Sequence, residues 1–329
     1  MGAPRIAMIT GAGGQDAYFL SRRLSRKGVK VVGVVRPGGG GESIPEARLR
    51  YFNELQEIDL RDTGRLRSLI CGLSPDFILN FGAIAGSLTQ QTDAQSLVQV
   101  NTGAVAAILE AMTAERSSAT FLQASSSEVF AGGRIFPQGL GTPRSPRTIY
   151  GATKIASDSL VRIFRESHGL ACYSVILYSH ESPLRKASFF SKRIVSQVLD
   201  VVEGKARRVV VHSPDAVRDW GYAGEYCDAV ADRLLKGLTG DLVLGTGVYT
   251  TVRQFAALVC SKVGLNYEDI VDEVPLQEGR AMEGVAVVAD ASAAGFCLAD
   301  GVKFDVGRLV SLLVRCERRS REFRGRAGL

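Results

Sequence analysis

Tyr150 and Lys154 are the two side chains in this sequence whose types and spacing most clearly suggest chemistry. They open and close the run Tyr-Gly-Ala-Thr-Lys. Residues four apart share one face of a helix, so the Lys154 ammonium can sit beside the Tyr150 phenol. A free phenol loses its proton only near pH ~10, and a neighbouring cation favours the phenolate. Tyr150 is therefore a candidate base near neutral pH, although a chain with nine Tyr also shows this spacing by chance.

Two further candidates stand at the end of an apolar, strand-like run that begins at Ala119. This run ends in three serines followed by Glu128. Ser126 can hydrogen-bond the same substrate oxygen as Tyr150, and the Glu128 carboxylate can take up and return a proton. The serines could instead only cap the strand end, and Glu128 could be an exposed acid in a turn.

A glycine-rich turn lies near the start of the chain. The apolar run Ile6 to Thr10 leads into Gly-Ala-Gly-Gly-Gln-Asp-Ala, which is followed by a helical pattern. A strand, such a turn and a helix N-terminus place backbone N–H groups and the positive end of a helix dipole against a pyrophosphate. Gly11 and Gly14 would permit the tight turn and the close approach. An ordinary glycine turn is the alternative.

The next apolar run, Val29 to Val35, ends in Arg36. An acidic residue there would bind the ribose 2′-hydroxyl of NAD, whereas an Arg suits the 2′-phosphate of NADP. We therefore predict NADP as the cofactor. A solvated Arg at the start of a loop is the alternative.

Apolar runs and helical spacings alternate through the first half of the chain. This pattern predicts right-handed β-α-β units and an α/β, Rossmann-like, doubly wound parallel sheet. A helix is expected after the glycine-rich turn. We expect strands at 6–10, 29–35, 56–59, 77–80, 119–125 and 171–177, and further helices at 63–71, 96–114 and 148–167.

Past Ser179 the regular alternation ends. The pattern there predicts helices at 189–203, 224–236 and 252–263 and short strands at 209–211 and 241–244. We expect an NADP-binding domain over 1–178, with part of 217–246 returning to it. A smaller, mixed substrate lobe would occupy 179–329 and lie beyond the carboxyl ends of the strands, where ligands of such sheets bind.

Composition excludes several classes of protein. No apolar run approaches ~18 residues and no signal peptide is evident, so we expect a cytoplasmic protein without a membrane partner. The net charge is +6, and Arg315 to Leu329 contribute +4 of it with six Arg and two Glu. We interpret this stretch as a solvated or disordered tail, and no motif suggests nucleic acid. The six Cys and three His lack metal-ligand spacing, so we predict free thiols and no metal.

Several motifs together resemble a known family. The Gly-x-x-Gly-x-x-Ala opening, Asp59-Leu60, the serine-rich strand end and Tyr150-x-x-x-Lys154 resemble the extended short-chain dehydrogenase/reductases, which act on nucleotide sugars. More narrowly, the chain is similar to the GDP-mannose 4,6-dehydratase family over roughly its whole length. The narrower resemblance rests on Gly-Gln-Asp at 14–16, Val35-Arg36, His180-Glu181-Ser182-Pro183 with Arg185, and Arg218-Asp219-Trp220-Gly221.

The resemblance implies roles for particular residues. Ser126, Glu128, Tyr150 and Lys154 would carry the chemistry. The substrate would meet Glu181, Lys192, Arg218 and Arg280, with Arg218 facing its diphosphate. NADP would contact Gly11, Gly13, Gly14, Gln15, Asp16, Arg36, Asp59, Leu60, Lys154, His180 and Arg185.

The implied reaction is an NADP-dependent hydro-lyase reaction that converts GDP-mannose or a related GDP-sugar to its 4-keto-6-deoxy form. Oxidation of C4 to a ketone makes the C5 hydrogen acidic. Tyr150 would take the O4 proton, and Glu128 would remove the C5 proton and then help the 6-hydroxyl leave. Returning the hydride to C6 regenerates the cofactor, which stays bound. A nucleotide-sugar reductase or epimerase on the same fold, or a non-catalytic NADP-binding protein, remains open.

Some positions depart from the family pattern. Ala85-Gly86-Ser87 replaces Ser-His-Val, Ser179 replaces an Asn, Arg280-Ala281 replaces Arg-Pro, and the order of basic residues at Lys192-Arg193 is altered. These differences leave open which GDP-hexose or GDP-heptose is the substrate. The segment from Arg36 to Tyr51 resembles the family's loop that reaches a neighbouring subunit's cofactor site, which suggests a homodimer or homotetramer.

Overall fold

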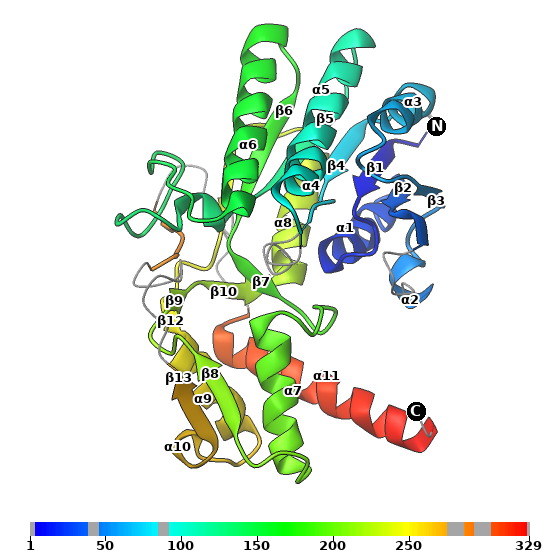
Figure 1. The fold of residues 1–329 in the computed structure, drawn as a ribbon. Helices are drawn as coiled ribbons and strands as arrows, with labels where there is room; N and C mark the ends of the chain where they lie inside the picture. The colour runs from blue at the N-terminus through cyan, green and yellow to red at the C-terminus, as the bar shows by residue number, and fades with distance from the viewer. Residues whose placement is uncertain (1–3, 39–45, 85–91, 275–285, 293–303, 328–329) are drawn as a thin grey trace.

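A seven-stranded parallel sheet forms the centre of the larger part of the protein, with strand order β11-β6-β5-β4-β1-β2-β3 (Figure 1). The computed structural model describes residues 4–38, 46–84, 92–274, 286–292 and 304–327. The order runs outward in both directions from β1 and β4, which confirms the predicted doubly wound α/β fold. The strands are β1 (Ile6–Thr10), β2 (Lys30–Val35), β3 (Glu54–Glu57), β4 (Phe77–Asn80), β5 (Thr120–Ser126), β6 (Cys172–Leu177) and β11 (Leu242–Leu244).

Helices cover both faces of this sheet because its strands carry apolar side chains on both sides. In β1, Ala7 and Ile9 join one apolar core and Met8 joins the other. The first core is closed by α1 (Gln15–Ser25) and α8 (Ala223–Leu235), which pack against each other. The second is closed by α3 (Thr63–Leu73), α5 (Ala104–Ala114) and α6 (Ile149–His168).

The predicted helix at 96–114 is present but is widened in its middle. It consists of α4 (Ala94–Val98), a π-helical turn η3 (Gln99–Gly103) and α5. The Asn101 side chain in this turn accepts a hydrogen bond from Ile84 N at 2.8 Å and donates to Thr153 Oγ1 at 3.2 Å. Among the described residues, Ala94–Ala114 is the stretch long and apolar enough to cross a membrane, but half of its most apolar window is buried within the protein. Packing in the core therefore accounts for its composition.

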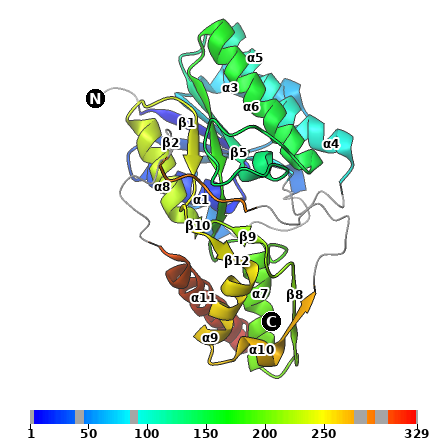
Figure 2. The same cartoon turned by 90° about the vertical axis from the view of Figure 1, so that its left-hand side faces the viewer.

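A smaller lobe lies beyond the carboxyl ends of the strands (Figure 2). Its core joins side chains from helices and from a two-stranded parallel sheet, including Leu199, Phe255 and Leu313. The lobe contains α7 (Phe190–Val202), β8 (Val209–His212), α9 (Val252–Lys262), α10 (Tyr267–Ile270), β13 (Val271–Val274) and α11 (Val306–Ala327). Two short strand pairs link it to the sheet: β7 (Ser179–Glu181) with β10 (Trp220–Tyr222), and β9 (Val217–Arg218) with β12 (Thr250–Thr251).

The basic C-terminal stretch belongs to α11, so its interpretation as a disordered tail was wrong, whereas most of its described side chains are exposed, as a solvated end requires. Leu309 and Leu313 are buried in the core of the lobe. Further along, the buried Glu317 carboxylate forms an ion pair with the Lys192 ammonium at 2.6 Å and another with the Arg321 guanidinium. Disorder was predicted from the charges of the stretch alone, without the apolar positions of the same helix that precede it.

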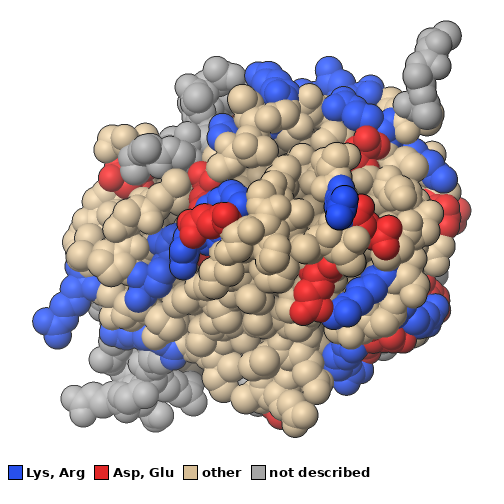
Figure 3. Space-filling model, turned by 90° about the horizontal axis from the view of Figure 1, so that it is seen from above, with Lys and Arg blue, Asp and Glu red and all other residues tan. Residues whose placement is uncertain are grey.

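Seen from above, basic side chains are scattered among acidic and neutral ones (Figure 3). No continuous basic field covers that face of the described surface. The positive net charge is therefore not concentrated over this end of the sheet domain.

Candidate active site

The glycine-rich turn joins β1 to α1 at the carboxyl edge of the sheet. Gly11 has φ +71°, and a Cβ at this position would come within 2.8 Å of the Gly82 backbone nitrogen, so only glycine fits. Gly14 is the N-cap of α1, and no side chain caps this helix. The first turn of α1 is therefore built to receive an anion at its backbone N–H groups.

Arg36, Asp59 and Leu60 lie near this turn, at the ends of β2 and β3. Arg36 is exposed. A hydrogen bond from Arg61 lowers the pKa of Asp59, and the Arg36 charge lowers it further. A Cβ on Gly82 would lie 2.6 Å from Leu60 Cδ1, and Gly82 also touches Gly11, so Leu60 borders the turn.

Tyr150 and Lys154 lie together in the first turns of α6, as their spacing predicts. The helix begins at a Thr148 side chain that accepts a hydrogen bond from Gly151 N at 3.0 Å. Lys154 is buried, and its Nζ donates to the carbonyl oxygen of Ala124 in β5 at 2.7 Å. The same Nζ lies 5.5 Å from the centroid of the Tyr150 ring.

The pKa of Tyr150 differs from the expectation of a base near neutral pH. Burial raises the pKa of this phenol to about 12, although a hydrogen bond with Ser126 lowers it in part. Burial also lowers the pKa of Lys154 to about 8, opposed by the Asp158 carboxylate. The phenol therefore keeps its proton at neutral pH, because desolvation outweighs the attraction of nearby cations.

Ser126 and Glu128 lie against the start of α6. The 3-10 turn η4 (Ser127–Phe130) carries Glu128, whose backbone nitrogen donates to Ser126 Oγ at 3.3 Å. A Cβ on Gly151 would lie 2.8 Å from the Glu128 carbonyl oxygen, so the two segments touch. The Ser126 hydroxyl also hydrogen-bonds Tyr150. The structure thus brings the predicted acid–base residues into one cluster.

Arg218 reaches this cluster from β9. Burial lowers the pKa of its guanidinium, and the nearby Glu128 carboxylate raises it. Its Nη1 donates to the Val217 carbonyl oxygen at 2.8 Å. A cation from the segment that links the lobe to the sheet therefore lies near enough to the predicted catalytic carboxylate for the two charges to interact.

Gln15 joins the glycine-rich turn to the His-Glu-Ser-Pro motif. Its Nε2 donates to the His180 carbonyl oxygen at 2.8 Å, and its Oε1 accepts from Ser182 Oγ at 2.7 Å. These contacts span more than half the chain and place His180 beside the first turn of α1. The Arg185 and Asp16 charges both influence the pKa of Tyr150, so the motif also lies near the acid–base cluster.

Other predicted substrate residues have partners within the lobe. The buried Glu181 carboxylate accepts from Ser191 Oγ at 2.5 Å and pairs with Arg185 Nε at 3.2 Å. The Lys192 ammonium pairs with Glu317. Arg280 and the segment Ala85 to Ser87 lie outside the described residues. A substrate contact for any of them stays a prediction.

Asp219 is a residue whose role sequence reasoning missed. The motif analysis gives Asp219 no role of its own, whereas its side chain is fully buried. It accepts hydrogen bonds from Thr246 N at 2.8 Å, Gly247 N at 2.9 Å and Ala289 N at 3.2 Å, and a further one from the Thr246 hydroxyl. The sequence signal for this role was an acidic residue directly before the apolar Trp220. Asp219 fixes the segment that carries Arg218.

Asp219→Ala is expected to lower the free energy of unfolding by about 3–5 kcal/mol. Several buried donors would lose their acceptor at once, and each unsatisfied group costs about 1–3 kcal/mol, partly relieved by relaxation. Urea unfolding followed by circular dichroism measures the change. Asp272→Ala, which breaks an exposed ion pair with Arg208, is the control and should cost at most about 1 kcal/mol. Equal effects of the two substitutions would contradict this role.

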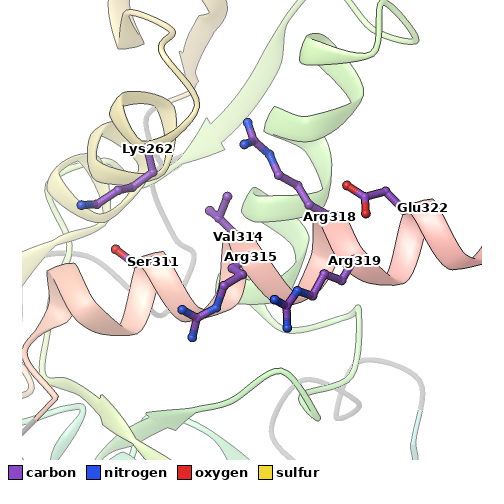
Figure 4. A pocket seen from close by; sticks show the side chains of 7 residues that line it. All are labelled: Lys262, Ser311, Val314, Arg315, Arg318, Arg319 and Glu322. Carbon is purple, nitrogen blue, oxygen red and sulfur yellow. The ribbon is translucent and has the colours of Figure 1, made fainter.

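A surface hollow of about 380 Å³ lies on the lobe, along α11 and the end of α9 (Figure 4). None of the predicted site residues lines it. Its lining is Lys262, Ser311, Val314, Arg315, Arg318, Arg319 and Glu322. It lacks the hydroxyl–carboxylate cluster found at α6, so the candidate active site is the α6 cluster.

Comparisons with known proteins agree with this geometry. The sequence profile of the family described as GDP-mannose 4,6 dehydratase matches residues 8–293. The chain belongs to this family. The human protein "GDP-mannose 4,6 dehydratase" is 34% identical over 266 residues, which cover 78% of this chain and 72% of the relative. The motif-based resemblance and the enzyme class, a hydro-lyase, are thereby confirmed.

Solved structures confirm the fold. A dTDP-glucose 4,6-dehydratase from Bacillus anthracis in complex with NAD superposes with a TM-score of 0.79 at 16% identity, covering 97% of this chain and 98% of that one. The protein RMD from Pseudomonas aeruginosa complexed with NADPH gives a TM-score of 0.76 at 18% identity, covering 96% and 99%. Both share the sheet and the lobe of this family member.

Proposed function

We propose that this protein is a nucleotide-sugar 4,6-dehydratase that converts GDP-mannose or a related GDP-sugar to its 4-keto-6-deoxy form. The supporting observation is the cluster of Tyr150, Ser126 and Glu128, with Arg218 near the carboxylate. A hydroxyl pair alone would serve a reductase or an epimerase equally well. The separate carboxylate beside it is what an elimination requires.

The residues around the glycine-rich turn fit a dinucleotide. The Gly11 conformation and the uncapped start of α1 suit a pyrophosphate, and Leu60 borders the same turn. We propose that these residues, with Gly13, Gln15, Asp16, Asp59, Lys154, His180 and Arg185, hold NADP. The bound cofactor would supply the reversible oxidation of the sugar. We further propose that 1–178 and part of 217–246 form the cofactor domain and the remainder forms the substrate lobe.

Each side chain of the cluster has a distinct task in this proposal. Tyr150 takes the proton of O4 in its phenolate form, a minor fraction at neutral pH because burial raises its pKa, and the Ser126 hydroxyl hydrogen-bonds the same oxygen. Glu128 removes the C5 proton and passes it to the departing 6-hydroxyl, which leaves as water, and C5 takes a new proton from solvent by way of Glu128 when the hydride returns to C6. Arg218 faces the diphosphate of the substrate. Proton transfers at O4 and at C5 are thus assigned to different groups.

Arg36 is expected to select NADP over NAD. Arg36→Asp should weaken NADP binding at least about tenfold and reverse the preference, because a carboxylate repels the 2′-phosphate and suits the ribose hydroxyl. Fluorescence titration with both cofactors measures the two dissociation constants. Arg207→Asp, at an exposed position in the lobe, changes the charge equally and should leave the ratio unchanged. Tighter binding of NAD by the unmodified protein would refute the assignment.

We also propose that the protein is cytoplasmic. We propose that it forms a homodimer or homotetramer, because the segment from Arg36 to Tyr51 resembles the family's inter-subunit loop. Light scattering with NADP present tests the assembly, and a monomeric mass would refute it.

Mass spectrometry of GDP-mannose and other GDP-hexoses incubated with the protein tests the proposed reaction. A dehydratase yields a product lighter by one water. An epimerase gives a product of unchanged mass, and a reductase consumes reduced cofactor in proportion to product. No change with any GDP-hexose or GDP-heptose would overturn the proposal.

A further inference from the structure

Asp16 and His180 form a charge pair beside the glycine-rich turn. Asp16 is the second residue of α1, and His180 is the buried central residue of β7. His180 Nε2 lies 3.1 Å from Asp16 Oδ1. The imidazole ring stacks on the Tyr226 ring of α8, with 5.4 Å between the centroids. The pair therefore connects the helix of the turn to the motif that leads into the lobe.

The surroundings of the imidazole indicate that both ring nitrogens carry hydrogen. Nδ1 lies 2.6 Å from the Tyr178 carbonyl oxygen, which can only accept a hydrogen bond. Nε2 lies within ion-pair distance of the Asp16 carboxylate, although the two atoms are not aligned for a hydrogen bond. Burial alone would lower the pKa of His180, but the Asp16 charge raises it above the ordinary value. Burial would raise the pKa of Asp16, but His180 and then Arg185 hold it below the ordinary value.

The other titratable groups around the pair do not replace His180 as the partner of Asp16. The Arg185 guanidinium, which follows β7, is already paired with Glu181 at 3.2 Å. Burial raises the pKa values of Tyr226 and Cys227 of α8 well above their ordinary values, so both stay neutral. Loss of the His180 proton would therefore leave the Asp16 carboxylate, among the described residues, with a hydrogen bond from Gln15 and the charge of Arg185 that Glu181 shares.

An uncompensated carboxylate at this place opposes the ligand that the turn is built to receive. Asp16 stands in the first turn of α1, where backbone N–H groups meet a pyrophosphate. We propose that His180 in its protonated form neutralises Asp16, and that dinucleotide binding by this turn consequently depends on the protonation of His180. The pair acts as a positioning device and takes no part in proton transfer to substrate. This inference rests on the proposed dinucleotide site.

The sign of the pH dependence follows from the direction of the His180 shift. A histidine whose pKa is raised on folding stabilises the pair fully below its ordinary value of ~6.5. That contribution disappears as the pH rises through the raised pKa. Dinucleotide affinity should therefore be retained below pH ~6.5 and fall as the pH rises through the raised pKa of His180.

Nitrogen NMR of the imidazole rings tests the pair without cofactor or substrate. The chain has three histidines, so the His180 signal is the one that disappears in His180→Gln. We expect this signal to titrate with a midpoint above pH ~6.5, and we expect the midpoint to be lower in Asp16→Asn. Each pH unit between the two midpoints corresponds to a tenfold change in the protonation equilibrium of His180. A His180 signal that titrates at or below the ordinary value, or that ignores Asp16→Asn, would overturn the inference. This result does not depend on the proposed reaction.

Binding of NADP by the variants tests the consequence. The unmodified protein should lose up to about tenfold in affinity for each unit by which NADP binding raises the pKa of His180, as the pH passes from the pKa of the free protein to that of the complex. The NADP affinity of Asp16→Asn should not show the pH dependence that His180 causes. Any pH dependence that comes from titration of the 2′-phosphate of NADP itself would remain in this variant. His180→Gln should bind weakly at every pH, and adding Asp16→Asn should restore affinity. His212→Gln, at an exposed position, is the control and should match the unmodified protein.

Additive losses in the two single variants, with no rescue in the double variant, would contradict the proposal. The proposal would also be contradicted if the NADP affinity of the unmodified protein and that of Asp16→Asn showed the same pH dependence. Thermal unfolding checks that each variant is folded. If His180→Gln does not fold, the comparison of Asp16→Asn with the unmodified protein decides alone.

Discussion

Tyr150→Phe is expected to lower turnover of the GDP-sugar about 10²–10⁴-fold, the range for loss of a general acid–base group. The substitution removes only the hydroxyl. Lys154 should stay in place, because its ammonium bonds to the Ala124 carbonyl oxygen and not to the phenol. NADP affinity should therefore remain unchanged. Initial rates and a cofactor titration on the same preparation measure both quantities.

The pH dependence of turnover is a second test of the role of Tyr150. The raised pKa of Tyr150, about 12, means that the phenolate fraction grows as the pH increases. Turnover of the unmodified protein should rise with pH from about 6 to 7, where Lys154, with its pKa of about 8, remains largely charged. This rise should vanish from the residual activity of Tyr150→Phe. Tyr249→Phe removes an exposed hydroxyl as a control, and full activity in Tyr150→Phe would remove the proposed base.

Glu128→Gln should slow the loss of water from the sugar by about 10²–10⁴-fold, the same range as for Tyr150→Phe. Oxidation of C4 should remain possible. The amide cannot accept the C5 proton, whereas Tyr150 and Ser126 keep their contacts. The predicted result is absorbance of reduced cofactor after addition of GDP-mannose, without formation of the lighter product. Stopped-flow absorbance and mass spectrometry together measure it.

The control for Glu128 is Glu115→Gln, an equal change at an exposed helix end. It should leave both absorbance and product formation unchanged. A Glu128→Gln protein that releases product at the normal rate would show that another group removes the C5 proton. The distinction between dehydratase and epimerase would then lose its structural basis.

The central sheet was predictable because its strands are buried on both faces. Phe77–Asn80 was predicted with the observed bounds, since every residue of β4 is buried and the run is apolar. The third strand was placed two residues late, at 56–59 in place of Glu54–Glu57. That strand lies at the sheet edge and is largely exposed, so hydrophobic periodicity gives little signal there.

The site was predictable only as far as local spacing reaches. The Tyr150–Lys154 spacing and the glycine-rich turn are properties of single segments, and both lie as expected. The role of Asp219 depends on two distant loops, and β7, β9, β10 and β12 are too short to produce a period. The pKa of Tyr150 reflects burial, which is set by the whole fold and not by the four residues up to Lys154.

The most direct test of the proposed reaction is the mass of the product formed from GDP-mannose in heavy water with a catalytic amount of NADP. The proton that Glu128 removes from C5 leaves with the 6-hydroxyl, so C5 takes a deuteron from the solvent when the hydride returns to C6. We predict a product that has lost one water and gained deuterium in the sugar, with no net consumption of the cofactor. Unchanged mass, or one reduced cofactor consumed for each product, would contradict the account.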